Sequence, residues 1–215
     1  MNSTEKEISY TTTNSYSTLN TLTSKTKTVW FVCHGMGYLS RYFINYFKAL
    51  NAEENYIIAP QAQSKYYIAP KYKHVGASWL TKENTQKETE NVMLYIDAVL
   101  EAEQLPKDIS LIMLGYSQGV SITMRYIVRR KIHCTQLVLM SGGIPKELVA
   151  TDFNFLKGKT KVSLIYGTQD EYMNEERMKY EKKRVHELFG NDVKIVSFEG
   201  KHEVNVAFLN NLLAH

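Results

Sequence analysis

The chain has 215 residues, of which 44% are hydrophobic and 22% charged, values that are typical of globular domains and exclude wholesale disorder. Its formal net charge of +4 is too small an excess to indicate binding to nucleic acid. No apolar stretch approaches the roughly 20 residues of a membrane span, residues 1–28 lack the apolar core of a secretory signal, and two cysteines are too few for a disulfide framework. We therefore expect one cytoplasmic domain over residues 1–215 with a flexible tail at 1–7, no nucleic-acid partner and no stable membrane insertion.

Apolar runs typical of buried strands alternate with segments of helical periodicity along the chain. The expected strands are 8–19, which alternates only weakly, 29–33, 56–59, 109–114, 136–140, 162–166 and 193–198. The expected helices are 38–50, a long helix in which Thr85 and Glu88 have the spacing of a capping box, 118–130, 174–189 and 204–213. Residues 61–80 read as irregular, and 142–160 as a loop or short helix. This alternation predicts an α/β fold, a three-layer α/β/α sandwich with a mostly parallel sheet.

The sequence Gly115-Tyr-Ser-Gln-Gly119 matches G-x-S-x-G and lies between an expected strand and an expected helix, the context that this motif requires. A strand-to-helix turn this tight brings backbones together, so its flanks need glycine, while the Oγ of Ser117 is left exposed. The helix N-terminus adds partial positive charge where negative charge develops during acyl transfer. Ser117 is therefore the candidate nucleophile; the alternative is a small-residue turn that packs a helix on a sheet.

A serine nucleophile needs a base, and the base needs an orienting acid. In the chain order serine, acid, histidine, His202 lies in a loop between the last expected strand and the last helix, where such sheets collect their chemistry. We expect His202 to be the base. His133, His186 and His215 are weaker candidates.

Asp170 directly follows the expected strand 162–166 and precedes His202 in the chain. We expect it to orient the imidazole and to stabilise the imidazolium as it forms. The alternative is a turn-forming aspartate. Glu171 is the main competitor for the acid role, and Asp152 and Asp192 fit the topology less well.

An oxyanion hole for this motif takes one backbone N–H from the residue after the nucleophile, here Gln118, and a second from the loop after an earlier strand. That loop is His-Gly-Met-Gly at residues 34–37, whose glycines allow close backbone approach. Met36 is the expected second donor, with Gly37 or Tyr38 as alternatives. His34 is expected to hydrogen-bond within the loop, not to act as the base.

Four motifs follow one another in the chain: His34-Gly-Met-Gly37, Gly115-Tyr-Ser-Gln-Gly119, Gly167-Thr-Gln-Asp170 and Gly200-Lys-His202. Together they resemble the α/β-hydrolase superfamily, and within it the phospholipase/carboxylesterase family, which includes acyl-protein thioesterase-like enzymes. The resemblance spans about residues 29–213. It implies an α/β-hydrolase fold, Ser117 as nucleophile with Asp170 and His202 as partners, Met36 and Gln118 as oxyanion donors, and no metal or organic cofactor.

Two segments depart from the family pattern. Tyr38-Leu-Ser-Arg stands where the thioesterases typically have small polar residues, and Trp79-Leu-Thr where relatives often have Trp-Phe-Asp. These segments would line the acyl pocket, so the substrate stays open. Gly37, Tyr38 and Trp79 are the candidate substrate-binding residues. Tyr42, Tyr66 and Tyr67 are further candidates for pocket walls, with core or surface filler as the alternative for each tyrosine and for Trp79.

Residues 141–161, where many lipases insert a lid, number only about twenty, which predicts an open site without a large lid. We expect a serine carboxylesterase that cleaves small-molecule esters or thioesters through an acyl-enzyme, as a monomer or a homodimer. The alternatives in the same chemistry are an acyl thioesterase, a lysophospholipase, a perhydrolase or a peptidase. A non-catalytic binding protein on the same fold is disfavoured because all three members of a triad are present.

Overall fold

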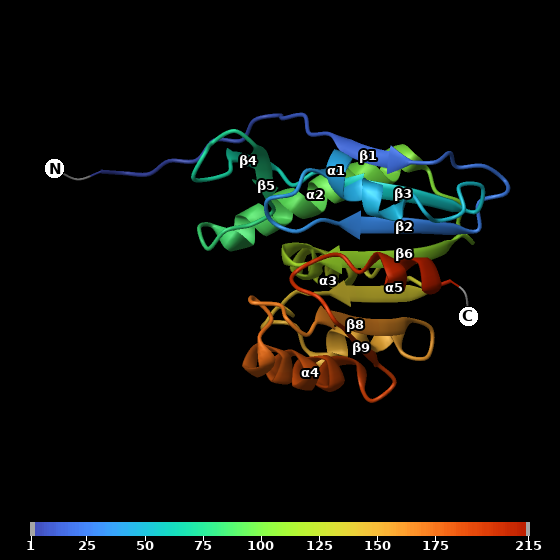
Figure 1. Ribbon diagram of the computed structural model, residues 1–215. Coiled ribbons are helices and arrows are strands. Elements are labelled where there is room, and N and C mark those ends of the chain that lie inside the picture. The colour runs from blue at the N-terminus through green and yellow to red at the C-terminus, as the bar shows by residue number, and fades with distance from the viewer. Residues whose placement is uncertain (1–2, 214–215) are drawn as a thin grey trace.

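A computed structural model describes residues 3–213 (Figure 1), and its centre is a seven-stranded sheet in the order β1-β3-β2-β6-β7-β8-β9. The strands are β1 (Tyr16–Leu19), β2 (Thr28–Cys33), β3 (Asn55–Pro60), β6 (Ser110–Tyr116), β7 (Gln136–Met140), β8 (Lys161–Gly167) and β9 (Lys194–Phe198). Strand β1 runs antiparallel to β3, and every other neighbouring pair is parallel. The predicted mostly parallel sheet is confirmed.

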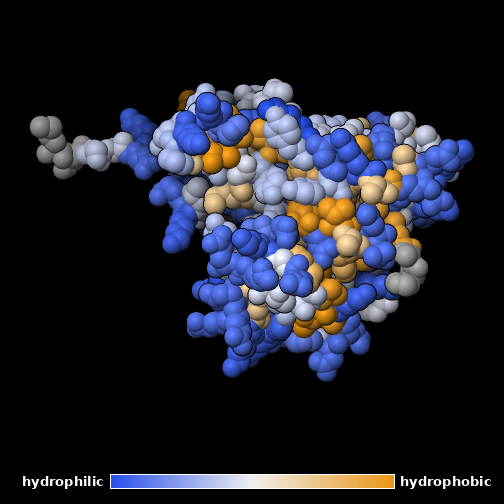
Figure 2. Space-filling model, viewed as in Figure 1, coloured by the Kyte–Doolittle hydropathy of each residue, from blue (hydrophilic) through white to orange (hydrophobic). Residues whose placement is uncertain are grey.

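Helices cover both faces of the sheet, so the predicted three layers are confirmed. One face carries α2 (Thr85–Glu103), α3 (Gln118–Arg130) and α4 (Glu175–Phe189). The other carries α1 (Ser40–Phe43), the 3₁₀ helix η1 (Ile44–Phe47) and α5 (Val206–Asn211). Because side chains alternate across a strand, Val29 and Phe31 of β2 join the first core and Trp30 and Val32 the second. Figure 2 shows the face of α5 with small apolar patches between hydrophilic side chains.

The expected helix over 38–50 is shorter and changes its winding. It consists of one turn of α-helix, α1, continued by η1. Because 3₁₀ winding eclipses residues three apart, Ile44 and Phe47 both face the core. The long helix α2 begins as expected at Thr85, but its N-cap is Asn84, which makes no side-chain capping bond, so the expected capping box is absent.

Residues 61–80 contain a hairpin that the sequence pattern did not predict, formed by β4 (Ser64–Tyr67) and β5 (Val75–Ser78). All four residues of β4 are exposed, so the strand lacks the alternation of buried and exposed side chains that marks a half-buried strand. The weakly alternating run at 8–19 forms a strand only over Tyr16–Leu19. Of the expected tail, residues 3–7 form no helix or strand, and residues 1–2 lie outside the described chain.

Candidate active site

Ser117 is the single residue between the end of β6 and the start of α3. Its backbone has φ 52° and ψ −120°, a conformation that a residue with a side chain rarely adopts. The turn is held in place because the N–H of Ser117 donates to the carbonyl of Met140 at the end of β7, at 2.8 Å. Strain of this kind, fixed by the surrounding structure, is typical of active sites.

The glycines on either side of Ser117 are required by close backbone contacts. A Cβ on Gly119 would lie 2.1 Å from the carbonyl oxygen of Cys33, and one on Gly115 would lie 2.5 Å from the backbone of Val120. Either side chain would force backbone to move. The motif therefore sets how closely α3 approaches β2.

The structure brings the three predicted triad residues together in a chain of hydrogen bonds. The Nε2 of His202 lies 2.9 Å from the Oγ of Ser117, and its Nδ1 lies 2.7 Å from Oδ2 of Asp170. The second carboxylate oxygen accepts the N–H groups of Tyr172 and Met173 at 2.9 and 3.0 Å. The Asp170 side chain is completely buried, whereas that of His202 is 19% exposed. The carboxylate is thus held rigidly, and the imidazole stands at the surface between it and the serine.

Two tyrosines fix the position of His202, and neither was predicted to do so. The hydroxyl of Tyr116, next to the serine, donates to the carbonyl of His202 at 2.9 Å. The ring of Tyr172 lies edge-on to the imidazole with 4.9 Å between centroids, and it is 69% exposed. In the sequence, the only sign of this role of Tyr172 is its position two residues after Asp170.

The other candidate acids and bases lie elsewhere in the described chain. Glu171 is exposed, and Asp152 accepts the N–H of Val149 at the start of η2 (Ala150–Leu156). Asp192 precedes β9, at the opposite end of the sheet from Ser117. Among the histidines, His133 contacts Phe155 and His186 bonds the carbonyl of Gly190. His215 lies outside the described residues.

The three candidates for the second oxyanion donor differ in whether their backbone N–H group already has an acceptor. The N–H of Gly37 donates to Ala77 at 2.9 Å, and that of Tyr38 donates to Gly35 at 3.3 Å. The N–H of Met36 has no acceptor among residues 3–213. The N–H of Gln118 opens α3, where a helix offers no internal acceptor. Met36 and Gln118 therefore have the available donors.

His34 bonds locally. The N–H of Ala62 donates to its Nε2 at 3.1 Å, so the other nitrogen, Nδ1, carries the proton that bonds the carbonyl of Gly35 at 2.7 Å. The side chain is fully buried, and burial lowers the pKa of His34 to about 4. His34 is thus a neutral brace of the loop at 34–37, as the sequence indicated.

Trp79 corrects one expectation about the pocket. It was expected in the pocket wall, yet it is only 1% exposed. Its indole N–H donates to the carbonyl of His34 at 2.8 Å, and the two rings lie 5.0 Å apart. Trp79 therefore supports the 34–37 loop from inside the core and presents almost no surface to a ligand.

The side chain of Gln118 has a role that sequence reasoning missed. Its Oε1 accepts the N–H of Trp79 at 2.8 Å, while its Nε2 donates to the carbonyl of Leu80 at 2.7 Å and to Ser78 at 3.0 Å. One residue thus carries a candidate oxyanion donor on its backbone and fastens the segment after β5 with its side chain.

The remaining pocket candidates lie on the loop after β2, on α1 and on the β4–β5 hairpin. Gly37 has φ +87°, and a Cβ on Gly76 of β5 would lie 2.7 Å from its Cα, so the β4–β5 hairpin lies directly on this loop. Tyr38 is half-buried, and its ring packs edge-on against Tyr116 at 5.8 Å. Tyr42, Tyr66 and Tyr67 are exposed, the last two on the hairpin.

Residues 3–213 lack two further classes of feature. Nowhere in this range do three or more His, Cys, Asp or Glu side chains gather in a way that could hold a metal ion. No helix there combines the length and the apolar character that are needed to cross a membrane.

The buried His34 makes stability depend on pH. In the unfolded chain the pKa of His34 returns to about 6.5, so the unfolded state binds a proton below that pH. The folded state binds this proton only near pH 4. Between pH 7 and pH 5 this costs the folded state about 2 kcal/mol. Chemical denaturation at both pH values should show that loss in the wild type and a loss smaller by that amount in His34→Gln. Equal losses would contradict the assignment.

No curated protein sequence matches this chain. Among solved structures it is similar to acyl-protein thioesterase 2 of Zea mays, with a TM-score of 0.68 and 15% identity over 93% of this chain and 96% of that one. It is similar to a phospholipase/carboxylesterase of Dyadobacter fermentans DSM 18053, with a TM-score of 0.66 and 21% identity over 96% and 99%. The sequence profile of the phospholipase/carboxylesterase family matches residues 15–215. The chain therefore belongs to the phospholipase/carboxylesterase family of the α/β-hydrolase superfamily.

Proposed function

We propose that the protein is a serine carboxylesterase that hydrolyses small carboxylic esters through an acyl-enzyme. The observation that carries the proposal is the hydrogen-bonded chain from Ser117 through His202 to the buried Asp170, with the serine on a strained turn. Family membership supports the general class, a hydrolase of carboxylic esters. Cytoplasmic location and a monomeric or dimeric state stay predictions.

In the first half of the proposed reaction, the Oγ of Ser117 attacks the ester carbonyl while Nε2 of His202 takes its proton. The carbonyl oxygen becomes an oxyanion, which the N–H groups of Met36 and Gln118 stabilise. His202 then gives the proton to the departing alkoxide, and the carbon–oxygen bond breaks to leave an acyl-serine and an alcohol.

Water completes the cycle by the same route. It attacks the acyl-serine and loses a proton to His202, which returns the proton to Ser117 as the carboxylic acid leaves. Asp170 keeps Nδ1 protonated and stabilises the transient imidazolium. Because its carboxylate already accepts two backbone N–H groups, it is fixed for that role before substrate arrives.

The segment between β7 and β8 favours small substrates. Its only regular element is the short helix η2, and side chains of α4 form hydrogen bonds to its backbone at two points. Glu181, fully buried, accepts the N–H of Ile144 at 2.9 Å, and Arg184 donates to the carbonyl of Leu148 at 2.8 Å. A segment anchored in this way leaves the serine open at the surface and gives no deep cover for a long acyl chain.

Replacement of the nucleophile tests the proposal most directly. Ser117→Ala should abolish labelling by a fluorophosphonate probe and lower p-nitrophenyl acetate hydrolysis by a factor of about 10⁴ or more. Circular dichroism should show an intact fold, because only one hydroxyl is lost and its partner, His202, is partly exposed. A panel of p-nitrophenyl esters from acetate to palmitate, with acetylthiocholine for comparison, should show highest kcat/KM for short or medium oxygen esters. A folded wild type that is not labelled would overturn the proposal.

Variants of the neighbouring residues Asp170 and Glu171 identify which carboxylate orients His202. Asp170→Asn should lower kcat by a factor of about 10² to 10⁴, because the amide no longer stabilises the imidazolium. Glu171→Gln removes one carboxylate at the next position, where the side chain is exposed, and should change kcat by less than about twofold. If instead Asp170→Asn kept full activity and Glu171→Gln lost it, the acid role would pass to Glu171.

A further inference from the structure

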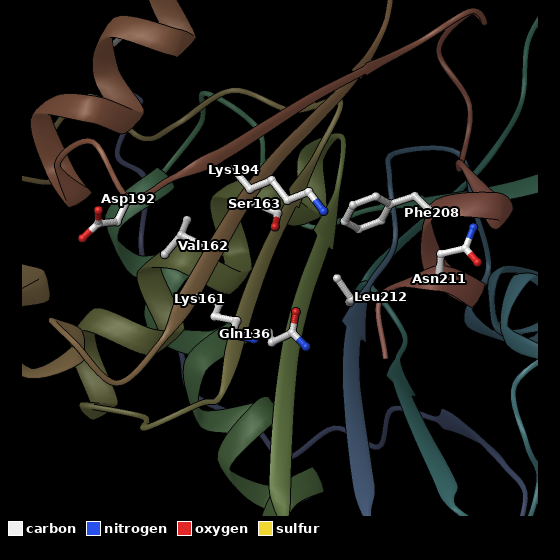
Figure 3. Close-up of a pocket in the computed structure, with 9 residues that line it drawn as sticks. All are labelled: Gln136, Lys161, Val162, Ser163, Asp192, Lys194, Phe208, Asn211 and Leu212. Atoms are coloured by element: carbon white, nitrogen blue, oxygen red, sulfur yellow. The ribbon is translucent and has the colours of Figure 1, made fainter. Parts of the chain in front are cut away.

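A second polar hollow lies at the other end of the sheet from Ser117. It has a volume of about 290 Å³ and is formed by the first residues of β7, β8 and β9 together with α5 (Figure 3). In a parallel sheet all strands begin at one edge and end at the other. The triad follows the carboxyl ends, so the hollow and the triad are separated by the length of β8, roughly 20 Å for its seven residues.

Four polar side chains form a continuous group on one face of the sheet. Gln136 pairs with Lys161 across β7 and β8, and Ser163 pairs with Lys194 across β8 and β9. Lys161 and Ser163 are two apart in one strand and therefore share a face. The same face carries Ile165, which belongs to the core under α5. The apolar face thus becomes polar where the strands begin.

None of these side chains has a hydrogen-bond or ion-pair partner among residues 3–213. Ser163 is only 5% exposed, yet its hydroxyl lines the hollow and forms no hydrogen bond in that range. The ammonium groups of Lys161 and Lys194 form no ion pair there, and the amide of Gln136 has no side-chain partner. Because no carboxylate or carbonyl of residues 3–213 engages them, these donors are available to a ligand in the hollow.

The charges and the lining indicate what that ligand is. Figure 3 shows the ammonium of Lys194 directed toward Phe208 and the Asp192 carboxylate pointing away from both lysines. Two ammonium charges match the charge of a phosphate monoester, about −1.5 to −2 at neutral pH, and its oxygens accept several hydrogen bonds. Phe208 and Leu212 of the α5 segment supply an apolar wall beside the donors.

We propose that this hollow binds a phosphate monoester with a small apolar or aromatic group, the phosphate on Lys161, Ser163 and Lys194 and the apolar group against Phe208. The site is separate from the triad. Its occupancy does not depend on Ser117.

Titration calorimetry with phenyl phosphate and inorganic phosphate tests the site on the full chain. Phenyl phosphate should bind saturably to the wild type and to Ser117→Ala alike. The double variant Lys161→Met/Lys194→Met should weaken the binding of phenyl phosphate by about tenfold or more, because two charge-assisted hydrogen bonds are lost. Phe208→Ala should remove the preference for phenyl phosphate over inorganic phosphate while leaving inorganic phosphate unchanged.

The matched control is Lys48→Met/Lys107→Met, which makes the same change of net charge at exposed lysines outside the hollow and should leave binding unchanged. Ser163→Ala should weaken binding by about threefold to tenfold. If both double lysine variants weakened the binding of phenyl phosphate equally, the ligand would be responding to net charge only, and the proposal would be overturned. The absence of saturable binding in a wild type that hydrolyses esters normally would also overturn it, and would leave the esterase proposal intact.

Discussion

The close approach of α3 to β2 is the constraint on which the rest of the site depends. With no Cβ at Gly119, the backbone of the helix comes within contact of the Cys33 carbonyl. This contact places the first residue of the helix beside the loop that follows β2, so the N–H groups of Gln118 and Met36 lie on the two segments that it joins. The strained conformation of Ser117 follows from the same geometry, since the chain must turn from strand to helix within one residue.

Around this contact, buried and half-buried polar side chains link neighbouring segments. His34 joins the loop after β2 to the segment after β3, Trp79 joins it to the segment after β5, and Gln118 joins that segment back to α3. Each bond is made by a side chain whose partner is a backbone group, and burial makes each costly to leave unpaired. These bonds hold the Ser117 end of the sheet in place, which suits the proposed reaction, in which preplaced donors stabilise charge.

The parallel sheet, its three layers and the nearness of Ser117, Asp170 and His202 could be predicted because they depend on local patterns. Buried strands read as apolar runs, and residues such as Asp170 and His202 directly follow the strands that position them. The hairpin β4–β5 could not be predicted because its first strand is exposed throughout and lacks periodicity. Trp79 was misread because an aromatic residue in an irregular segment gives no sign of which way it faces. The roles of the Gln118 side chain and of Tyr172 arise from contacts between distant segments, which spacing along the chain does not encode.

The two anchors from α4 have a consequence for redesign of the molecule. Glu181 and Arg184 form hydrogen bonds to the backbone of Ile144 and Leu148. A loop inserted between those two positions would disrupt both bonds and leave the buried carboxylate of Glu181 without its N–H partner. Gly158 lies in the same connection, with φ +69° and no atom within 4 Å of the position that a Cβ would take. An inserted segment is therefore best spliced at Gly158, where added chain would meet no atom of the protein.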